Sequence, residues 1–182
     1  GCEIPGVYQI EKEEIMFASL KERVVVVAGG SSGIGQAVVK VLLKYGMKVA
    51  LLYNSHPAEV EQLCQESKVD ANHLVQYKID VRNIAAVSSV FEQVERKFGG
   101  IDFLVNSAGI VSDSFLVLMR DQSFEEVIDI NLKGVFYLMK AALPYLLEGE
   151  VSKGIVNISS VAGLKGVPGQ VNYCASKAGV LG

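Results

Sequence analysis

Short runs of apolar residues alternate along the chain with longer segments in which apolar positions recur every three or four residues. The short runs are typical of strands buried in a parallel sheet, and the longer segments are typical of helices that cover it. Five strands are expected, at residues 24–27, 49–53, 74–79, 103–105 and 155–158. Helices are expected after the first strand as far as residue 45, at residues 57–67, 84–98 and about 123–147, and around residue 173.

Proline and glycine mark the ends of several of these helices. Pro57 stands where the second helix is expected to open, Gly46 is the expected C-cap of the first, and Gly99-Gly100 closes the third. With right-handed crossovers, the alternation predicts an α/β fold, a doubly wound parallel sheet (Rossmann fold) with strand order 3-2-1-4-5. We expect residues 21–182 to form one domain, and residues 1–20 to be an N-terminal extension to which we assign no function.

Charge and hydropathy exclude two classes of partner. The net charge is −3 and no block of like charges occurs, whereas binding to phosphate backbones needs clustered Lys and Arg. The apolar stretch 127–147 favours a buried helix over a membrane span because polar side chains interrupt it. These side chains are Asp129, Asn131, Lys133 and Lys140. We therefore expect neither nucleic acid nor a membrane as a partner.

The cysteines and histidines favour neither a disulfide framework nor a metal site. Cys2, Cys64 and Cys174 are widely spaced, and the only histidines are His56 and His73. A reducing compartment is expected, namely the cytoplasm, with the mitochondrial matrix as the alternative. The acidic segment 11–14 argues against a transit peptide.

A glycine-rich segment, Gly29-x-x-x-Gly33-x-Gly35, stands directly after the first expected strand and directly before the first helix. Glycines in this position let the backbone turn tightly and approach a pyrophosphate, whose charge then meets the amide groups of a helix N-terminus. The alternative is an ordinary tight turn. Because of the strand before it and the helix after it, we predict that the segment binds a dinucleotide.

Tyr173 and Lys177 are four residues apart on an expected helix, so they share one face. A cation roughly 4 Å from a phenol favours the phenolate by about 4 kcal/mol at an effective dielectric constant near 20, which brings a tyrosine into the range of acid–base catalysis. The alternative is a half-buried tyrosine beside a solvated lysine. Other motifs in the sequence are needed to distinguish the catalytic pair from this alternative.

These motifs occur in the order Gly29-x-x-x-Gly33-Ile34-Gly35, Asn106-Ser107-Ala108-Gly109, Asn131, Ser160 and Tyr173-x-x-x-Lys177. Over roughly residues 22–182 the chain thereby resembles the short-chain dehydrogenase/reductase family. Residues 106–113, 125–132 and 163–170 are most similar to the 3-oxoacyl-acyl-carrier-protein reductases and to related carbonyl and quinone reductases.

The resemblance implies catalytic roles for four residues. Tyr173 would protonate the carbonyl oxygen, and Lys177 would favour its phenolate and hydrogen-bond the nicotinamide ribose. Ser160 would donate a hydrogen bond to the same oxygen as charge develops on it. Asn131 would hold a water that links Lys177 to solvent, although a simple interior polar side chain is the alternative.

The resemblance also implies a set of residues that contact the cofactor. Asp80 and Val81 would lie against the adenine, with a turn or helix cap as the alternative role of Asp80. The whole set is Gly29, Ser31, Ser32, Gly33, Ile34, Gly35, Asn54, Asp80, Val81, Asn106, Ala108, Gly109, Tyr173 and Lys177.

The end of the second strand bears on the choice of cofactor. An acidic residue there would bind the adenosine ribose and repel a 2′-phosphate, but the residues are Tyr53-Asn54-Ser55. NADP(H) is therefore expected over NAD(H), and only modestly, because Ser32 stands where many NADP-using relatives have an arginine. Ala28 and Ser107 also depart from the family pattern, where threonine and asparagine are usual. Cys174 is interpreted as a packing residue.

Members of this family continue past the length of this chain with two more strands and a loop that covers the substrate. We therefore expect the fold to be C-terminally incomplete, with an unpaired apolar edge at the fifth strand. One hypothesis is an NADPH-dependent reductase of a small-molecule or acyl-carrier-bound carbonyl, a homo-oligomer (dimer or tetramer) at full length. The other is a shortened, non-catalytic chain that binds nucleotide or pairs with full-length subunits.

Overall fold

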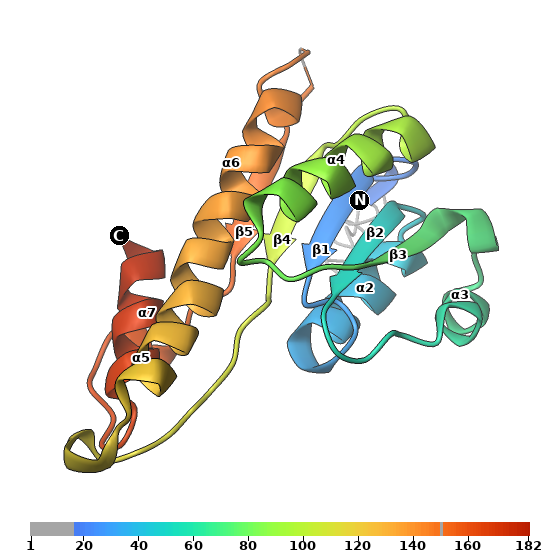
Figure 1. Ribbon diagram of the computed structural model, residues 1–182. Helices are drawn as coiled ribbons and strands as arrows, with labels where there is room; N and C mark the ends of the chain where they lie inside the picture. The colour runs from blue at the N-terminus through green and yellow to red at the C-terminus, as the bar shows by residue number, and fades with distance from the viewer. Residues whose placement is uncertain (1–16, 150) are drawn as a thin grey trace, which may run out of the picture.

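The computed structural model describes residues 17–149 and 151–182, and five parallel strands form its central sheet (Figure 1). The strand order β3-β2-β1-β4-β5 confirms the predicted doubly wound α/β fold. The first sixteen residues of the expected N-terminal extension lie outside the described residues. The strands are β1 (Val24–Ala28), β2 (Lys48–Tyr53), β3 (Leu74–Lys78), β4 (Phe103–Asn106) and β5 (Gly154–Asn157).

Helices cover both faces of the sheet, as the crossovers of a parallel sheet require. One apolar cluster packs α4 and α6 on one face, and a second packs α2 and α3 on the other. The helices are α2 (Gly33–Lys44), α3 (Val60–Ser67), α4 (Ile84–Phe98), α5 (Asp121–Ile128), α6 (Gly134–Leu146) and α7 (Val171–Leu181). Shorter helical segments are η1 (Ala71–His73), η2 (Leu116–Leu118), η3 (Asp129–Lys133) and η4 (Val161–Gly163).

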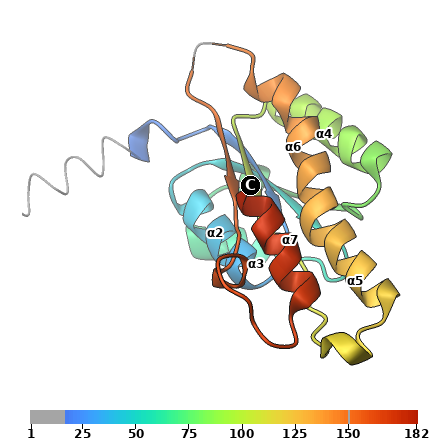
Figure 2. The same cartoon turned by 90° about the vertical axis from the view of Figure 1, so that its left-hand side faces the viewer.

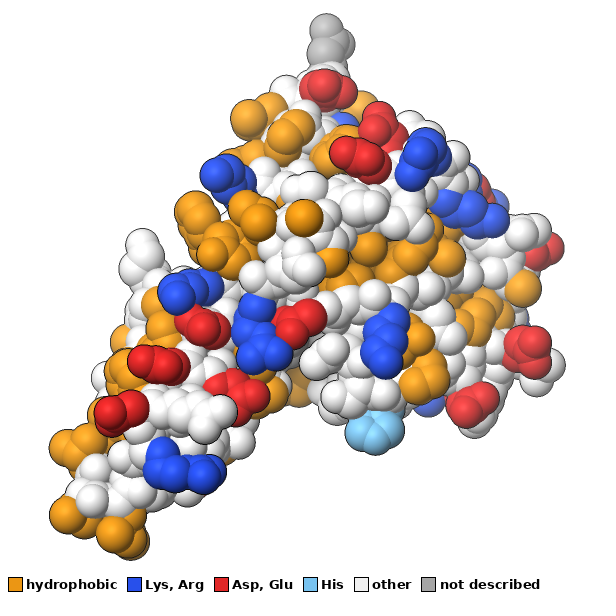
Figure 3. Space-filling model, viewed as in Figure 1, with side chains coloured by type: hydrophobic (Ala, Val, Ile, Leu, Met, Phe, Trp, Pro, Cys, Tyr) orange, Lys and Arg blue, Asp and Glu red, His pale blue; other side chains and the backbone are white. Residues whose placement is uncertain are grey.

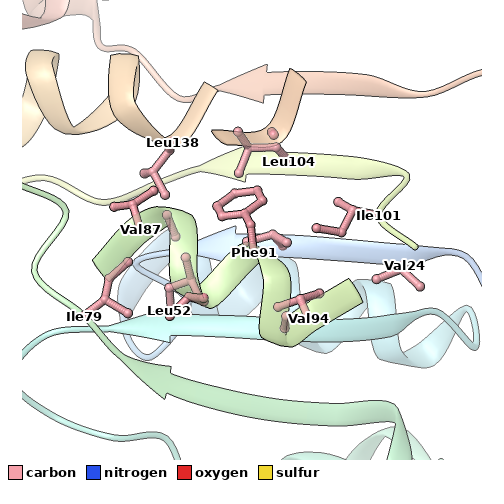
Figure 4. Packing of buried hydrophobic residues seen from close by; sticks show 14 residues of the cluster. Val24, Leu52, Ile79, Val87, Phe91, Val94, Ile101, Leu104 and Leu138 are labelled. Carbon is pink, nitrogen blue, oxygen red and sulfur yellow. The ribbon is translucent and has the colours of Figure 1, made fainter. Parts of the chain in front are cut away.

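Both faces of β1 are buried, which explains why its sequence is a continuous apolar run. Val24, Val26 and Ala28 belong to the cluster under α4 and α6, whereas Val25 and Val27 belong to the cluster under α2 and α3. Figure 4 shows the first of these clusters, with the fully buried ring of Phe91 from α4 close to Leu104 of β4. Burying a side chain of that size stabilises the fold by about 1.5–3 kcal/mol.

One helix boundary was predicted wrongly. α3 begins at Val60 rather than at Pro57. The side chain of Gln76 on β3 bonds both backbone groups of Ala58: Oε1 accepts from the Ala58 N–H at 3.0 Å, and Nε2 donates to its carbonyl at 3.3 Å. These two bonds keep residues 57–59 in a non-helical conformation, so the helix begins three residues later than predicted.

The long helix predicted at about 123–147 runs from Asp121 to Leu146, but a π-helical turn, η3, interrupts it. The predicted span is confirmed within two residues at each end. The π turn was not predicted, because apolar spacing does not distinguish one wider turn within a helix. Such single turns occur frequently at functional sites.

β5 is the edge of the five-stranded sheet and pairs with β4 alone. Val156 on β5 is 57% exposed, so the expected apolar edge is confirmed for the described residues.

On the face drawn in Figure 3, Lys and Arg side chains are interspersed with Asp and Glu. Within residues 17–149 and 151–182, no helix is long and apolar enough to cross a membrane.

Candidate active site

A cleft of about 230 Å³ lies where β1, β2, β3 and β4 end. The carboxyl edge of a doubly wound sheet, where the strand order reverses, is the usual ligand site of this fold. Eight of the predicted cofactor residues line the cleft: Gly29, Ser31, Ser32, Asn54, Asp80, Val81, Ala108 and Gly109. Segments far apart in the sequence therefore meet around one cleft, and contact of these residues with a cofactor stays a prediction.

The glycine turn after β1 is required by close packing. Gly29 has φ +74°, and a Cβ added there would lie 2.7 Å from the Ala108 backbone nitrogen. A Cβ added at Gly35 would overlap the Gly29 carbonyl oxygen. The turns after β1 and β4 can therefore touch only because Gly29 has no side chain. Gly33, with φ +51°, has no atom within 4 Å of its missing Cβ and faces open space.

The N-terminus of α2 has the properties of an anion site. Its N-cap residue, Ser32, has extended backbone and makes no side-chain capping bond. The first N–H groups of a helix have no partner within the helix and carry partial positive charge. These residues fit the pyrophosphate of a dinucleotide, since a phosphate oxygen there would accept from the backbone without meeting a side chain at Gly33.

Asp80 lies between β3 and α4 and is paired within the protein. Its Oδ1 accepts from the Arg82 N–H at 2.9 Å, and its Oδ2 lies 2.7 Å from the Arg82 guanidinium nitrogen Nη2. Hydrogen bonds from the Arg82 side chain lower the pKa of the Asp80 carboxyl below its usual range. Asp80 therefore caps a turn and also lines the cleft, and its contact with an adenine stays a prediction.

Tyr173 and Lys177 lie on α7, one helical turn apart, with the Lys177 Nζ 5.8 Å from the centre of the Tyr173 ring. Lys177 is only 5% exposed, and its ammonium donates to the Ile158 carbonyl at 2.8 Å. Burial lowers the pKa of Lys177 from its usual value. No residue of the described ranges is hydrogen-bonded to the Tyr173 hydroxyl, so this group is available to a ligand.

Ser160 stands at the start of η4, where its Oγ accepts from the Ala162 N–H at 3.1 Å. This turn is held firmly against α7 (Figure 2). A Cβ added at Gly163 would lie 2.7 Å from the Lys177 carbonyl carbon, and the Ser159 hydroxyl donates to the Lys177 carbonyl oxygen at 2.8 Å. The turn that carries Ser160 is therefore fixed to the helix that carries Tyr173.

Asn131 is fully buried in the π turn η3. Its Oδ1 accepts from the Ile110 N–H at 2.8 Å, and its Nδ2 donates to the Ile110 carbonyl at 2.9 Å and to the Ser176 hydroxyl at 3.2 Å. The Asn131 side chain thus joins the loop after β4 to α7. The expectation that Asn131 holds a water linked to Lys177 stays a prediction.

The other predicted cofactor residues lie beside the cleft rather than on its wall. Asn106 is 2% exposed, and its Nδ2 donates to the Asn157 Oδ1 at 2.7 Å. Gly33, Ile34 and Gly35 form the first turn of α2. Although Ala28 lacks the hydroxyl usual in the family, its carbonyl accepts from the Ser107 N–H at 3.0 Å.

Sequence reasoning missed several residues around the site. Ile110 and Ile130 form apolar wall of the cleft, and His56 lies at its rim beside Asn54. His56 could have been found because it directly follows the strand end that was examined. Asn172 and Ser176, both fully buried on α7, carried no sequence signal beyond their closeness to Tyr173.

Comparison with known proteins gives consistent matches. The sequence profile of the family described as "short chain dehydrogenase" matches residues 23–182. The 3-oxoacyl-[acyl-carrier-protein] reductase of Staphylococcus aureus is 39% identical over 156 residues, which cover 86% of this chain and 63% of that protein. The chain thus spans less than two thirds of the length of that relative.

Two solved structures have the same fold. A short chain dehydrogenase from Bacillus anthracis superposes with a TM-score of 0.82 and 30% identity, over 89% of this chain and 67% of the other. The aldohexose dehydrogenase of Thermoplasma acidophilum gives a TM-score of 0.79 and 33% identity, over 91% and 60%. Only the second name gives a substrate, so the shared fold does not by itself identify one.

Proposed function

Because the chain belongs to the short-chain dehydrogenase/reductase family, we propose that the protein reduces a carbonyl group to an alcohol with a hydride from NADPH. The observation that carries the proposal is the joining of Tyr173, Lys177 and Ser160 by one rigid unit, η4 packed on α7. That unit follows β5 at the carboxyl edge of the sheet, where the cleft that we propose as the dinucleotide site also lies. We propose residues 21–182 as the domain that carries this activity.

A bound nicotinamide dinucleotide would supply the hydride. The first turn of α2 would hold the pyrophosphate, and the walls around Asn54, Asp80 and Val81 would hold the adenosine. Ile110 and Gly109 would form the wall of the cleft toward α7. These residues would fix the cofactor without taking part in bond making.

The proton would come from a residue of α7. As the carbonyl carbon gains the hydride, Tyr173 would give its phenolic proton to the carbonyl oxygen, so that the product is the neutral alcohol. The Ser160 hydroxyl would donate a hydrogen bond to the same oxygen while negative charge develops there. The buried Lys177 ammonium would stabilise the phenolate left on Tyr173. Asn131 would hold the loop around Ile110 in place.

For the substrate we propose a 3-oxoacyl group carried on an acyl carrier protein. The support is the 39% identity to a reductase whose name gives that substrate. The test is oxidation of NADPH by the protein in its complete natural form, with a 3-oxoacyl thioester and with an aldohexose as the contrasting substrate. Turnover of the sugar alone would overturn the substrate class. Cofactor binding without turnover of any carbonyl would favour the non-catalytic alternative.

The preference for NADPH rests on the end of β2. Tyr53, Asn54 and Ser55 line the cleft there without a carboxylate that would repel a 2′-phosphate. The measurement is kcat/KM for NADPH against that for NADH. A clear preference for NADH would overturn this part of the proposal and leave the reaction class intact. A homo-oligomer is proposed on the family resemblance alone, and sedimentation would test it.

A further inference from the structure

Asn172, the residue before Tyr173, is fully buried, and its side-chain amide accepts one hydrogen bond and donates two. Its Oδ1 accepts from the Tyr173 N–H at 2.8 Å. Its Nδ2 donates to the Ser112 carbonyl at 3.0 Å and to the Ser123 carbonyl at 3.3 Å. A buried amide whose donors and acceptor are all matched fixes the position of every group that it touches.

These three bonds join three separate segments. Ser112 belongs to the loop after β4, Ser123 to the first turn of α5, and Tyr173 to α7. The same loop includes Ile110, which lines the cleft. Asn172 therefore connects the backbone of the proposed proton donor to Ser112, two residues from the cleft wall at Ile110.

The loop is also joined at the surface to the two residues just before α7. The Ser114 N–H donates to the Gly169 carbonyl at 2.9 Å, and the Gln170 Nε2 donates to the Asp113 Oδ2 at 3.0 Å in an exposed bond. On the other side of Tyr173, the Ser176 hydroxyl donates to the Tyr173 carbonyl at 2.8 Å. Both backbone groups of Tyr173 thus bind buried side chains of their own helix.

We propose that Asn172 is a positioning residue, which sets the location of Tyr173 relative to the loop of residues 110–114. The inference rests on the proposed function, since it assumes that Tyr173 is the proton donor. A local helix-capping role would need only the Oδ1 bond to the Tyr173 N–H. The two Nδ2 bonds, which reach 60 and 49 residues back along the chain, have no part in capping.

Asn172→Asp tests the proposal, because it keeps an oxygen for the Tyr173 N–H and replaces both donated bonds by an oxygen facing two carbonyls. A displacement of the reacting group by about 1 Å can cost on the order of 100-fold in rate. We expect kcat to fall by about that factor. The Kd for NADPH should change less than about twofold, because Asn172 does not line the cleft. Asn172→Ser, whose hydroxyl can still donate one bond, should give an intermediate kcat.

Gln170→Ala is the matched control, since it removes an exposed bond between the same two segments. It should leave kcat within about twofold of the wild type, as surface changes usually do. The proposal is overturned if Asn172→Asp keeps wild-type kcat. Equal losses of kcat and of NADPH affinity would also overturn it, since a general loss of structure would lower both. If Asn172→Asp does not fold, Asn172→Ser decides by the same two measurements.

Amide hydrogen exchange separates this inference from the proposed function. If the wild-type protein turns over no carbonyl, the proposed function fails, but exchange still reports whether Asn172 holds the two segments together. Asn172→Asp or, if it does not fold, Asn172→Ser should then speed exchange in both 110–116 and 172–177. Gln170→Ala should speed neither. Unchanged exchange at 110–116 in the Asn172 variants would overturn the positioning role.

Discussion

Asn131 forms hydrogen bonds with both backbone groups of a single residue, Ile110, accepting from its N–H at 2.8 Å and donating to its carbonyl at 2.9 Å. A side-chain amide thereby takes the place that a neighbouring strand would take in a sheet. Because Asn131 is fully buried in the π turn, the cleft wall at Ile110 is fixed by a helix on the far side of the loop.

Asn131→Ala should lower both stability and turnover. It leaves the part-buried N–H of Ile110 without its protein partner, which costs about 1 kcal/mol, and it opens a hole where the amide was. The free energy of unfolding in urea and kcat are the measurements. Asp70→Ala is the control, because Asp70 caps η1 at the other end of β3 from the cleft. It should cost about 1 kcal/mol of stability and leave kcat unchanged. Equal effects of the two variants on kcat would contradict the role of Asn131.

Tyr173→Phe should abolish most turnover and leave cofactor binding intact. Loss of a positioned acid typically costs about 10²–10⁴-fold in kcat. The ring remains, so packing on α7 is kept. Turnover is followed by NADPH absorbance, and binding by the fluorescence of NADPH. Tyr137→Phe, a change of the same kind on α6, is the control. Wild-type activity in Tyr173→Phe would show that another group donates the proton.

Lys177 should make stability rise with pH in the alkaline range. Its folded-state pKa lies below the ordinary 10.5, so between the two values the unfolded chain binds more protons than the folded one. The wild type therefore gains stability as pH rises through that window, by about 1.4 kcal/mol for each unit of lowering. Lys177→Met lacks this gain. Urea unfolding of both proteins from neutral pH to about 10.5 measures it, and a stability difference that stays constant with pH would contradict it.

Gly29→Ala should destabilise the fold and remove dinucleotide binding. Its methyl group would lie 2.7 Å from the Ala108 nitrogen, and its φ of +74° is unfavourable for alanine. The left-handed backbone alone costs about 1–2 kcal/mol. Gly166→Ala is the control, since a Cβ there meets no atom within 4 Å and φ is not in the left-handed region. Thermal unfolding and NADPH titration distinguish the variants. NADPH affinity as high in Gly29→Ala as in Gly166→Ala would contradict the role of the turn.

Asn54→Asp should shift the cofactor preference toward NADH. A carboxylate at the end of β2 would bind the ribose hydroxyls of NADH and repel a 2′-phosphate. We expect the ratio of kcat/KM values, NADPH over NADH, to fall by about tenfold, or about 1.4 kcal/mol. Ser67→Asp, a charge change away from the cleft at the end of α3, should leave the ratio unchanged. An unchanged ratio in Asn54→Asp would place the 2′-phosphate elsewhere.

The sequence allowed the sheet order and the span of the long helix to be predicted, because both follow from apolar periodicity and from the handedness of crossovers. The start of α3 was wrong because the Gln76 amide competes with the helix for the backbone of Ala58. Such a long-range side-chain bond cannot be recognised from the spacing of apolar residues. The π turn at Asn131 was missed because apolar spacing does not distinguish one wider turn within a helix.

The candidate site could be predicted in part from motif spacing. Most of the predicted cofactor residues line one cleft, since the ends of parallel strands meet at one edge of the sheet. The partners of Asn131 and Asn172 could not be predicted, because a buried amide is recognised only by the backbone groups that it meets in the fold. Apolar wall residues such as Ile130 resemble any other core position in the sequence.

The contact between Gly163 and the backbone of Lys177 limits how this protein can be re-engineered. A side chain at position 163 would push the turn and the helix apart, so neither can be redesigned without the other. Variation in substrate choice would therefore have to come from segments that are not fused in this way, such as the loop around η2, whose side chains from Phe115 to Leu118 are at least 67% exposed. A library aimed at new substrates should randomise that loop and keep position 163 as glycine.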